Sequence, residues 1–493
     1  MQNKKAIVIG AGIAGIAAAI RLKNLNFDVQ VYETCSCPGG KIAEMYRSGY
    51  RFDCGPSLFT MPHYIDELFE ISGKKASDYF QYEKQEVICN YFYEDGTHFT
   101  ALADIEEFAK EAENKFAVTA NEVKEYLKRS KLKFDVTSPV FLEKSLHRLS
   151  TYLSPETIKA IKNINKLDLT KSLHFLNKQN FKDPRLVQYF DRYATYNGSS
   201  PYLASGIMSV IPHLEQYYGT FFPKGGMFSI VKSLYQLAID IGVRFSFETK
   251  VEEILVKNKK VKGVMLDNTV KEANIVVSNM DIVPTYRNLL PNQKAPEKIL
   301  RQPRSSSALI FYWGIKKQFP QLELHNIFFS ANYREEFKSI FSKKQVYDDP
   351  TIYINITSKK EPKDAPDGCE NWFVMINVPC DERQDWEETI TRSRKNILDK
   401  LSRIIDVNIA PLIETEITLD PREIEHKTQS FKGALYGASS NTDFAAFLRH
   451  PNFSKKIKNL YLCGGSVHPG GGIPLCLLSA KIVSELVENR CIL

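Results

Sequence analysis

The most regular hydrophobic pattern in the chain lies at its start. Residues 6–9 form an apolar run with β-branched side chains, which is typical of a buried parallel strand. Residues 13–23 are mostly small and apolar, as in a helix that packs closely against a sheet, and a second apolar run ends at Glu33. The pattern therefore predicts a βαβ unit of strand, helix and strand.

Glycines occupy the turn between this first strand and the helix. Gly10, Gly12 and Gly15 form G-x-G-x-x-G, in which they allow a tight turn, the approach of a pyrophosphate and close helix packing, respectively. The helix N-terminus attracts phosphate, and Glu33 stands where it can accept a hydrogen bond from a ribose hydroxyl. An ordinary glycine-rich turn does not require this acidic residue, so we predict a dinucleotide site.

Later hydrophobic runs extend the same α/β pattern. Residues 63–195 have mainly helical periodicity, interrupted by a strand-like hydrophobic pattern at 87–93. Near the C-terminus, residues 478–487 predict a helix. Further strands are predicted at 243–248, 251–256, 261–266, 273–278, 308–313, 351–356 and 372–378. With 493 residues, the chain is too long for one compact core, so two or more domains are expected.

Charge is concentrated in one region of the chain. The whole sequence carries a net charge of +7, but residues 124–185 contain fourteen Lys or Arg and six Asp or Glu, a net +8. Apolar residues are interleaved there: Phe134, Val140, Phe141, Leu142, Leu146, Leu149, Tyr152 and Leu153. This stretch either docks on an anionic bilayer surface or is the solvated face of ordinary helices. No recognised nucleic-acid-binding module accompanies the charge, so we predict no nucleic-acid partner.

The cysteines and the longest apolar runs restrict the class of protein further. The nine cysteines include no C-x-x-C pair, which favours reduced thiols in the cytoplasm over a disulfide framework, and we predict no metal site. No run of 18 or more apolar residues occurs, so no spanning helix is predicted.

Several segments resemble flavoprotein motifs. The sequence Pro38-Gly39-Gly40-Lys41 resembles the continuation of the dinucleotide motif in FAD-binding oxidoreductases of the glutathione-reductase-like class, which favours FAD over NAD. Residues 52–56, 193–202 and 222–227 resemble segments of carotenoid desaturases and their flavin-dependent amine oxidase relatives. Residues 464–474 resemble the C-terminal segment of bacterial-type phytoene and carotenoid desaturases. Gly471 and Leu475 favour the branch that acts on hydroxylated carotenoids at the 3,4 position.

This resemblance implies a fold and a division of the chain. The fold class is α/β, with a Rossmann-like FAD-binding domain of the glutathione-reductase/amine-oxidase type and a discontinuous α+β substrate domain. Residues 1–95, 222–300 and 416–493 are assigned to the FAD-binding domain. Residues 96–221 are expected to form a helical substrate- and membrane-facing region, and residues 301–415 a mixed β-sheet that contacts substrate.

The resemblance also implies a site. The residues expected to bind FAD are Gly10, Gly12, Ile13, Ala14, Gly15, Glu33, Gly39, Gly40, Lys41, Gly55, Pro56, Ser57, Val251, Gly464, Gly465, Ser466, Gly472, Ile473 and Pro474. The catalytic residues are not identified; Asp53 and His468 are candidates, although Asp53 would equally serve to cap a backbone group in a turn.

The implied function is the desaturation of a lipophilic carotenoid by an enzyme associated peripherally with the cytoplasmic membrane, with oxygen or a quinone as electron acceptor. A phytoene desaturase, a carotenoid isomerase or saturase and a flavin amine oxidase are alternatives. An amine oxidase is expected to enclose its substrate cation in aromatic side chains, for which Tyr193 and Tyr196 are candidates. A non-catalytic isoprenoid-binding chaperone on the same scaffold is less consistent with the retained glycines.

Overall fold

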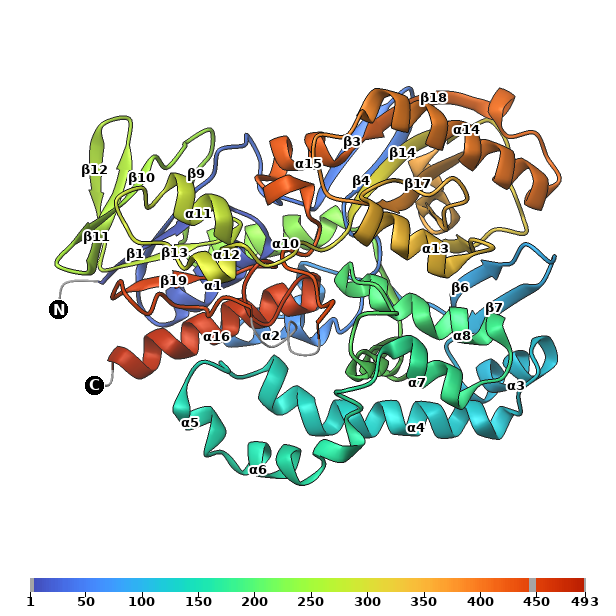
Figure 1. Ribbon diagram of the computed structural model, residues 1–493. Helices are drawn as coiled ribbons and strands as arrows, with labels where there is room; N and C mark the ends of the chain where they lie inside the picture. Colours follow the sequence, from blue (N-terminus) through green and yellow to red (C-terminus); the bar gives the residue numbers. More distant parts are fainter. Residues whose placement is uncertain (1–3, 443–448, 492–493) are drawn as a thin grey trace.

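A parallel sheet of five strands forms one half of the molecule (Figure 1). The computed structural model describes residues 4–442 and 449–491. The sheet order is β19-β13-β1-β2-β9, and every neighbouring pair is parallel. The strands are β1 (Lys5–Ile9), β2 (Asp28–Tyr32), β9 (Arg244–Ser246), β13 (Ile275–Ser278) and β19 (Leu460–Leu462). Segments that are distant in the sequence therefore build one sheet.

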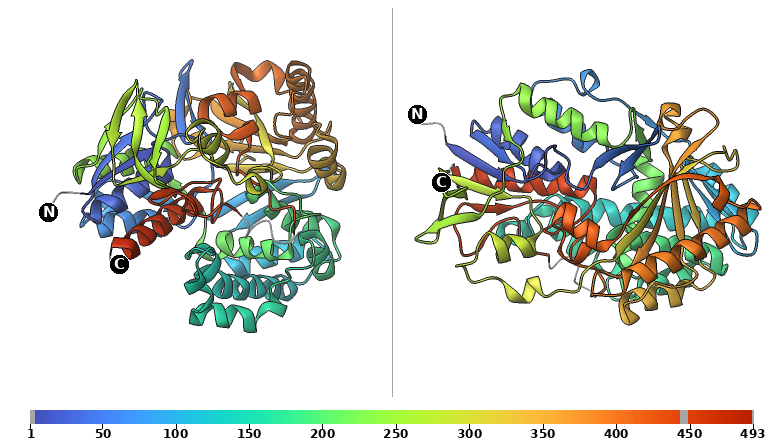
Figure 2. Two further views of the ribbon diagram at one scale, coloured as in Figure 1. Left: turned by 60° about the vertical axis from the view of Figure 1, so that its left-hand side comes forward. Right: turned by 90° about the horizontal axis from the view of Figure 1, so that it is seen from above.

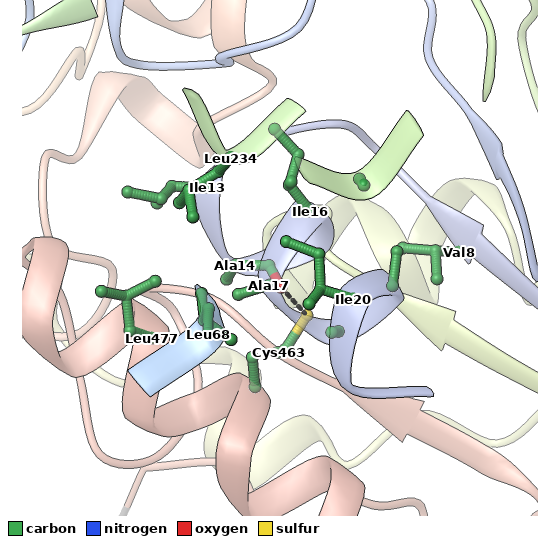
Figure 3. Packing of buried hydrophobic residues seen from close by; sticks show 14 of the residues in the cluster. Val8, Ile13, Ala14, Ile16, Ala17, Ile20, Leu68, Leu234, Cys463 and Leu477 are labelled. Atoms are coloured by element: carbon green, nitrogen blue, oxygen red, sulfur yellow. Dashed lines mark hydrogen bonds between the residues drawn. The ribbon is translucent and has the colours of Figure 1, made fainter. Parts of the chain in front are cut away.

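Helices cover one face of this sheet, and the small side chains of α1 allow them to pack closely. Ala17, Ala18 and Ala19 are fully buried. Around them lie Val8, Ile16, Ile20, Leu68, Leu234 and Leu477, shown in Figure 3. The helices are α1 (Ile13–Asn24), α2 (His63–Ile71), α10 (Phe228–Asp240) and α16 (Ile473–Cys491).

A smaller antiparallel sheet and two short helices pack on the other face of the parallel sheet. Their apolar side chains form one buried cluster with Ile7, Ile9 and Tyr32. These elements are β10 (Glu253–Lys257), β11 (Lys260–Leu266), β12 (Thr269–Glu272), α11 (Ile282–Asn288) and α12 (Glu297–Leu300). Both faces of the parallel sheet are thus covered, as its continuous apolar strands require.

A seven-stranded mixed sheet forms the second half, in the order β18-β14-β17-β16-β15-β6-β7. Only β15 and β6 pair in parallel; the other neighbours are antiparallel. Its strands are β6 (Val87–Phe92), β7 (His98–Leu102), β14 (Ser307–Ile315), β15 (His325–Phe328), β16 (Ile352–Ile356), β17 (Glu370–Val378) and β18 (Ile413–Leu419).

Both faces of this larger sheet are buried at its centre, where every residue of β14 is buried. Trp313 and Trp372 lie in one core with Leu401 of α14 (Trp386–Ile405). On the other face, Tyr50 and Phe52 of a hairpin pack in a second core; the hairpin is β3 (Ala43–Arg47) and β4 (Tyr50–Cys54). Nearby lie α13 (Tyr333–Lys338) and α15 (Pro421–Thr428).

A layer of helices lies at the bottom of the molecule in Figure 1 and in the left-hand view of Figure 2. It consists of α3 (Ile105–Lys115), α4 (Ala120–Thr137), α5 (Leu149–Tyr152), α6 (Pro155–Lys162), α7 (Leu173–Asn180), α8 (Pro184–Asp191) and α9 (Ile211–His213). Thr119 and Glu122 form a capping box that fixes the start of α4. The short strands β5 (Tyr82–Lys84) and β8 (Phe221–Pro223) pair where the chain enters and leaves this layer.

The predicted fold class is confirmed, but two strands cross the predicted domain boundaries. β6 falls inside residues 1–95, which the sequence assigns to the FAD-binding domain, and yet it pairs with β15 in the larger sheet. β18 spans the boundary predicted at residue 416. Alternating side chains reveal a strand but do not reveal which sheet receives it, so the division stays a prediction elsewhere. Among the helices described, none is both long and apolar enough to cross a membrane.

Candidate functional site

The glycine turn after β1 leaves the first N–H groups of α1 accessible. Gly12 is the N-cap of α1 and provides no side-chain hydrogen bond to the helix. A Cβ at Gly15 would lie 2.1 Å from the carbonyl oxygen of Gly10, so only glycine permits this approach of helix to strand. The positive end of the helix dipole therefore faces a space that suits phosphate.

Glu33 lies at the end of β2, beside the same turn. Its carboxylate accepts hydrogen bonds from the N–H of Ala11 at 2.7 Å and of Cys35 at 2.9 Å, and its side chain is buried. An ionised carboxylate has about four lone-pair sites, so these two bonds leave room for a ribose hydroxyl. The predicted Val251 lies close by, since Thr249 donates its N–H to the carbonyl oxygen of Glu33.

Two further predicted turns pack onto the first. Gly39 forms a bridge with Gly12, and a Cβ at Gly40 would lie 3.3 Å from the Cα of Gly12. A Cβ at Gly55 would lie 1.8 Å from the carbonyl oxygen of Lys41. The segment of Gly55, Pro56 and Ser57 is therefore held against the 39–41 turn.

The C-terminal glycines complete the site from the opposite end of the chain. β19 ends at Leu462, two residues before Gly464, whose N–H donates to Ser479 Oγ at 3.1 Å. The Ser466 hydroxyl accepts the N–H of Ile282 at 3.0 Å, so it caps α11 rather than pointing freely into the site. A Cβ at Gly465 would lie 3.2 Å from the Cα of Gly471. Gly472 directly precedes α16, which begins with Ile473 and Pro474.

Sequence analysis did not identify Asn279, which follows β13. With its amide oriented to satisfy its hydrogen bonds, the oxygen accepts the N–H groups of Gly12 and Gly15, each at 3.3 Å. A Cβ at Gly464 would lie 2.7 Å from the same amide. Asn279 thus joins the N-terminal and C-terminal glycine loops. The only signal in the sequence is its position directly after a predicted strand, which is shared by many polar residues.

These residues fit a dinucleotide such as FAD. The carboxyl ends of β1, β2, β13 and β19 meet at one edge of the sheet. Asn279, which was not predicted, clusters there with the predicted residues Gly10, Gly12, Ile13, Ala14, Gly15, Glu33 and Gly464. Ligands of parallel α/β sheets bind at this edge. The positions where a Cβ would collide are glycine, so the backbone is open to close approach. The contribution of each residue to binding stays a prediction.

Buried positive charges surround this edge. Lys41 Nζ donates to the carbonyl oxygen of Leu435 at 2.8 Å; burial lowers the pKa of its ammonium, and the Asp281 carboxylate opposes that shift. Arg449 donates to the carbonyl oxygens of Tyr436 at 2.7 Å and Gly465 at 3.2 Å, and burial lowers its pKa to about 10. With a pKa of about 10, Arg449 is cationic at neutral pH and complements an anionic ligand.

The candidate Asp53 is engaged in structural contacts. Its carboxylate pairs with Arg51 at 2.7 Å and accepts the N–H groups of Met227 at 2.8 Å and Phe228 at 3.3 Å, at the start of α10. Burial raises its pKa, and the Arg51 guanidinium opposes the shift. Asp53 therefore caps backbone N–H groups, as the structural alternative predicts. These contacts do not favour a role as catalytic base.

The candidate His468 is almost completely buried and links the C-terminal loop to the helical layer. Its Nε2 lies 3.0 Å from the carbonyl oxygen of Lys144. Burial lowers its pKa to about 4, so the ring is neutral at physiological pH. This geometry suits a positioning residue.

The tyrosines considered for an amine-binding cage already enclose a cation of the protein. The Arg192 guanidinium lies 4.5 Å from the ring centre of Tyr193 and 5.6 Å from that of Tyr196, and Tyr91 and Tyr189 contribute two more rings. Glu215 pairs with Arg192 at 3.0 Å. This cage is filled, so it offers no site for a substrate amine.

Comparison with known proteins identifies the family. The model for flavin containing amine oxidoreductases matches residues 13–487. The chain belongs to this family. It is 56% identical over 486 residues to the 1-hydroxycarotenoid 3,4-desaturase of Flavobacterium sp. (strain P99-3), with 99% of each chain covered. It is 33% identical to the 4,4'-diapolycopene oxygenase of Methylomonas sp, with 99% of this chain and 98% of that protein covered.

The solved structures extend the likeness of fold. An oxidoreductase from Methanosarcina mazei has a TM-score of 0.65 at 15% identity, over 98% of this chain and 100% of that chain. Family membership makes this protein an FAD-dependent oxidoreductase, as the glycine motifs predict. The predicted homology to carotenoid desaturases is likewise confirmed.

Substitutions at Gly12 and Glu33 test the cofactor site. We expect Gly12→Val to give folded, colourless protein, because its Cβ position lies 2.7 Å from the Asn279 amide. Glu33→Ala should weaken FAD binding roughly tenfold through loss of a charged hydrogen bond. Flavin absorbance per mole of protein measures both. Gly73→Asn is the control, since Gly73 has open space around it; full flavin occupancy in both site variants would contradict the assignment.

Burial of His468 predicts a pH dependence of stability. Its folded pKa of about 4 lies below the value of about 6.5 for an unfolded histidine, so the unfolded chain binds the proton first. Stability is therefore lost as the pH falls from 6.5 towards 4. Between pH 7.5 and 4.5, unfolding should show the wild type losing on the order of 2 kcal/mol more than His468→Asn. The exposed His426→Asn serves as control, and identical losses in all three proteins would refute this account.

Proposed function

We propose that this protein is a carotenoid desaturase that introduces a C=C bond at the 3,4 position of a hydroxylated, conjugated carotenoid. The observation that carries the proposal is the 56% identity, over 99% of both chains, to a protein named 1-hydroxycarotenoid 3,4-desaturase. The second relative, at 33% identity, is a carotenoid oxygenase by name, which supports the same lipophilic class of substrate.

The residues fit this chemistry. Desaturation removes a hydride from one carbon and a proton from its neighbour, and bound FAD supplies the hydride acceptor. A polyene offers few polar groups, so the protein must bind and orient an apolar chain and exclude water from it. Tyr50, Phe52, Tyr312 and Phe373 provide an aromatic, apolar core between the hairpin and the larger sheet. Oxygen or a quinone is the proposed final electron acceptor.

Two substrates presented in liposomes test the proposal. With bound FAD, a hydroxylated and already conjugated carotenoid should show a red shift in absorption, because a new double bond extends its conjugation, and phytoene should show none. A shift with phytoene alone would place the protein earlier in desaturation and contradict the 3,4 assignment. An unchanged spectrum with both substrates, despite bound flavin, would favour an isomerase, a saturase or an oxidase of amines.

We further propose that the enzyme reaches its substrate by docking on an anionic bilayer. Phe134, Val140 and Leu146 of the basic region are buried and cannot contact lipid. By contrast, the segment 152–166 exposes apolar side chains: Tyr152 at 52%, Leu153 at 81%, Ile158 at 50%, Ile161 at 60% and Ile164 at 49%. Lys159, Lys162 and Lys166 are exposed between them. Apolar and basic side chains on one short segment are suited to an anionic lipid interface.

Charge reversal tests this docking segment. The triple variant Lys159→Glu, Lys162→Glu and Lys166→Glu should reduce sedimentation with anionic liposomes at least tenfold, at about 1 kcal/mol per lysine. The matched control reverses Lys257, Lys259 and Lys271, three exposed lysines on the β10–β12 sheet. Equal binding by both triple variants would show that segment 152–166 is only a solvated surface.

A further inference from the structure

Ser57 belongs to a chain of hydrogen bonds that joins the cofactor turns to the larger sheet. Its hydroxyl lies 2.7 Å from the hydroxyl of Tyr353 on β16, and the Tyr353 hydroxyl lies 2.8 Å from Nδ1 of His325 on β15. His325 is 3% exposed, whereas Ser57 and Tyr353 are only partly buried. This series of hydrogen bonds therefore begins at a buried histidine and ends at a partly exposed serine.

Asn355 fixes the direction of these hydrogen bonds. Its Nδ2 donates to the carbonyl oxygen of Leu324 at 2.9 Å and lies 3.2 Å from His325 Nδ1. Because an amide N–H only donates, the Asn355 contact is satisfied when Nδ1 is the unprotonated, accepting nitrogen of His325; in this tautomer the proton is on Nε2, which is buried and has no hydrogen-bond partner among the described residues. Burial lowers the pKa of His325 to about 3, so the ring is neutral and its proton is on Nε2.

The remaining protons follow in order. Tyr353 has one hydroxyl proton and directs it to Nδ1, so its oxygen accepts the hydroxyl proton of Ser57. The single hydroxyl proton of Ser57 is then donated to Tyr353, so only the lone pairs of its oxygen remain available to another group. The relay of Asn355, His325, Tyr353 and Ser57 therefore presents a hydrogen-bond acceptor and not a donor.

The location of Ser57 connects this acceptor to the reaction. The turn at Gly55, beside Ser57, packs closely against the carbonyl of Lys41. Gly39, in the 39–41 turn, forms a β-bridge with Gly12. Ser57 thus stands between the dinucleotide turns and the larger sheet, on the path that we expect a substrate to take to the cofactor. In a 1-hydroxylated carotenoid, the hydroxyl carbon is only two bonds from the carbon at position 3. A hydroxyl so close to the reacting bond needs a partner at this end of the site.

We infer that Ser57, oriented by Tyr353, His325 and Asn355, accepts a hydrogen bond from the hydroxyl group of the substrate and so selects hydroxylated over unhydroxylated carotenoids. This inference rests on the proposed function, and it gives Ser57 a role toward substrate in place of the predicted contact with FAD. An unhydroxylated end would leave the Ser57 lone pairs unpaired against an apolar chain, which disfavours that substrate.

The test compares kcat/KM for a 1-hydroxylated carotenoid and for the same polyene without the hydroxyl group. Wild type should prefer the hydroxylated substrate by about tenfold or more. Ser57→Ala and Tyr353→Phe should lower kcat/KM for that substrate about tenfold, change the value for the other less than about twofold and retain full FAD. Ser57→Thr, which keeps the hydroxyl, should retain the preference.

Tyr91→Phe is the matched control, since it removes a tyrosine hydroxyl from β6 of the same sheet outside the relay, and it should retain the preference. Equal losses for both substrates in Ser57→Ala, or loss of FAD from it, would overturn the inference. Wild type that desaturates both substrates equally would overturn the inference and leave the proposed function standing. Wild type that desaturates neither would overturn both.

Discussion

The structure depends on the close approach of backbone to backbone around the N-terminus of α1. A side chain at Gly15 would collide with the Gly10 carbonyl, and one at Gly12 or Gly464 would collide with Asn279. Removing every Cβ from this point lets four parallel strands deliver their carboxyl ends to one place. The N–H groups of Gly12 and Gly15 donate to the Asn279 amide oxygen and that of Ala11 donates to Glu33, so side chains of the protein also fix this turn. The alanines of α1 also have small side chains, so α10 and α16 can pack closely against this helix.

The second half of the molecule is positioned relative to that point by a few polar links. Arg51 and Asp53 of the hairpin fix the start of α10, Asn279 joins the two glycine loops, and Arg449 ties the Tyr436 segment to Gly465. The Ser57–Tyr353 hydrogen bond spans from the cofactor turns to the larger sheet. These links are buried or partly buried, and each is made between residues far apart in the sequence. They hold the two halves of the molecule in a fixed arrangement around the site.

Sequence reasoning succeeds where function is encoded locally. Gly10, Gly12, Gly15 and Glu33 lie within one βαβ unit, so spacing alone predicts their arrangement. The hydrophobic pattern also reveals β6, β14, β16 and β17 of the larger sheet, but not β7, β15 and β18. It fails where a role arises only from tertiary contact. Nothing near Asp53 indicates that it caps a helix that starts at Phe228, and nothing near Tyr193 indicates that Arg192 occupies the space between the tyrosines. The membership of β6 in the larger sheet and the bridging role of Asn279 were missed for the same reason.

The distribution of the parallel sheet along the chain has a consequence for biosynthesis. β1 and α1 are made first, but β19 and α16, which complete the same layer, are made last. Until residues 460–491 have left the ribosome, the alanine-rich face of α1 that packs against α16 has no cover, and the glycines that close the dinucleotide cradle do not exist. A nascent chain in this state carries an exposed apolar helix, which makes it a substrate for chaperones. The complete cofactor site therefore forms only after residues 460–491 have been made.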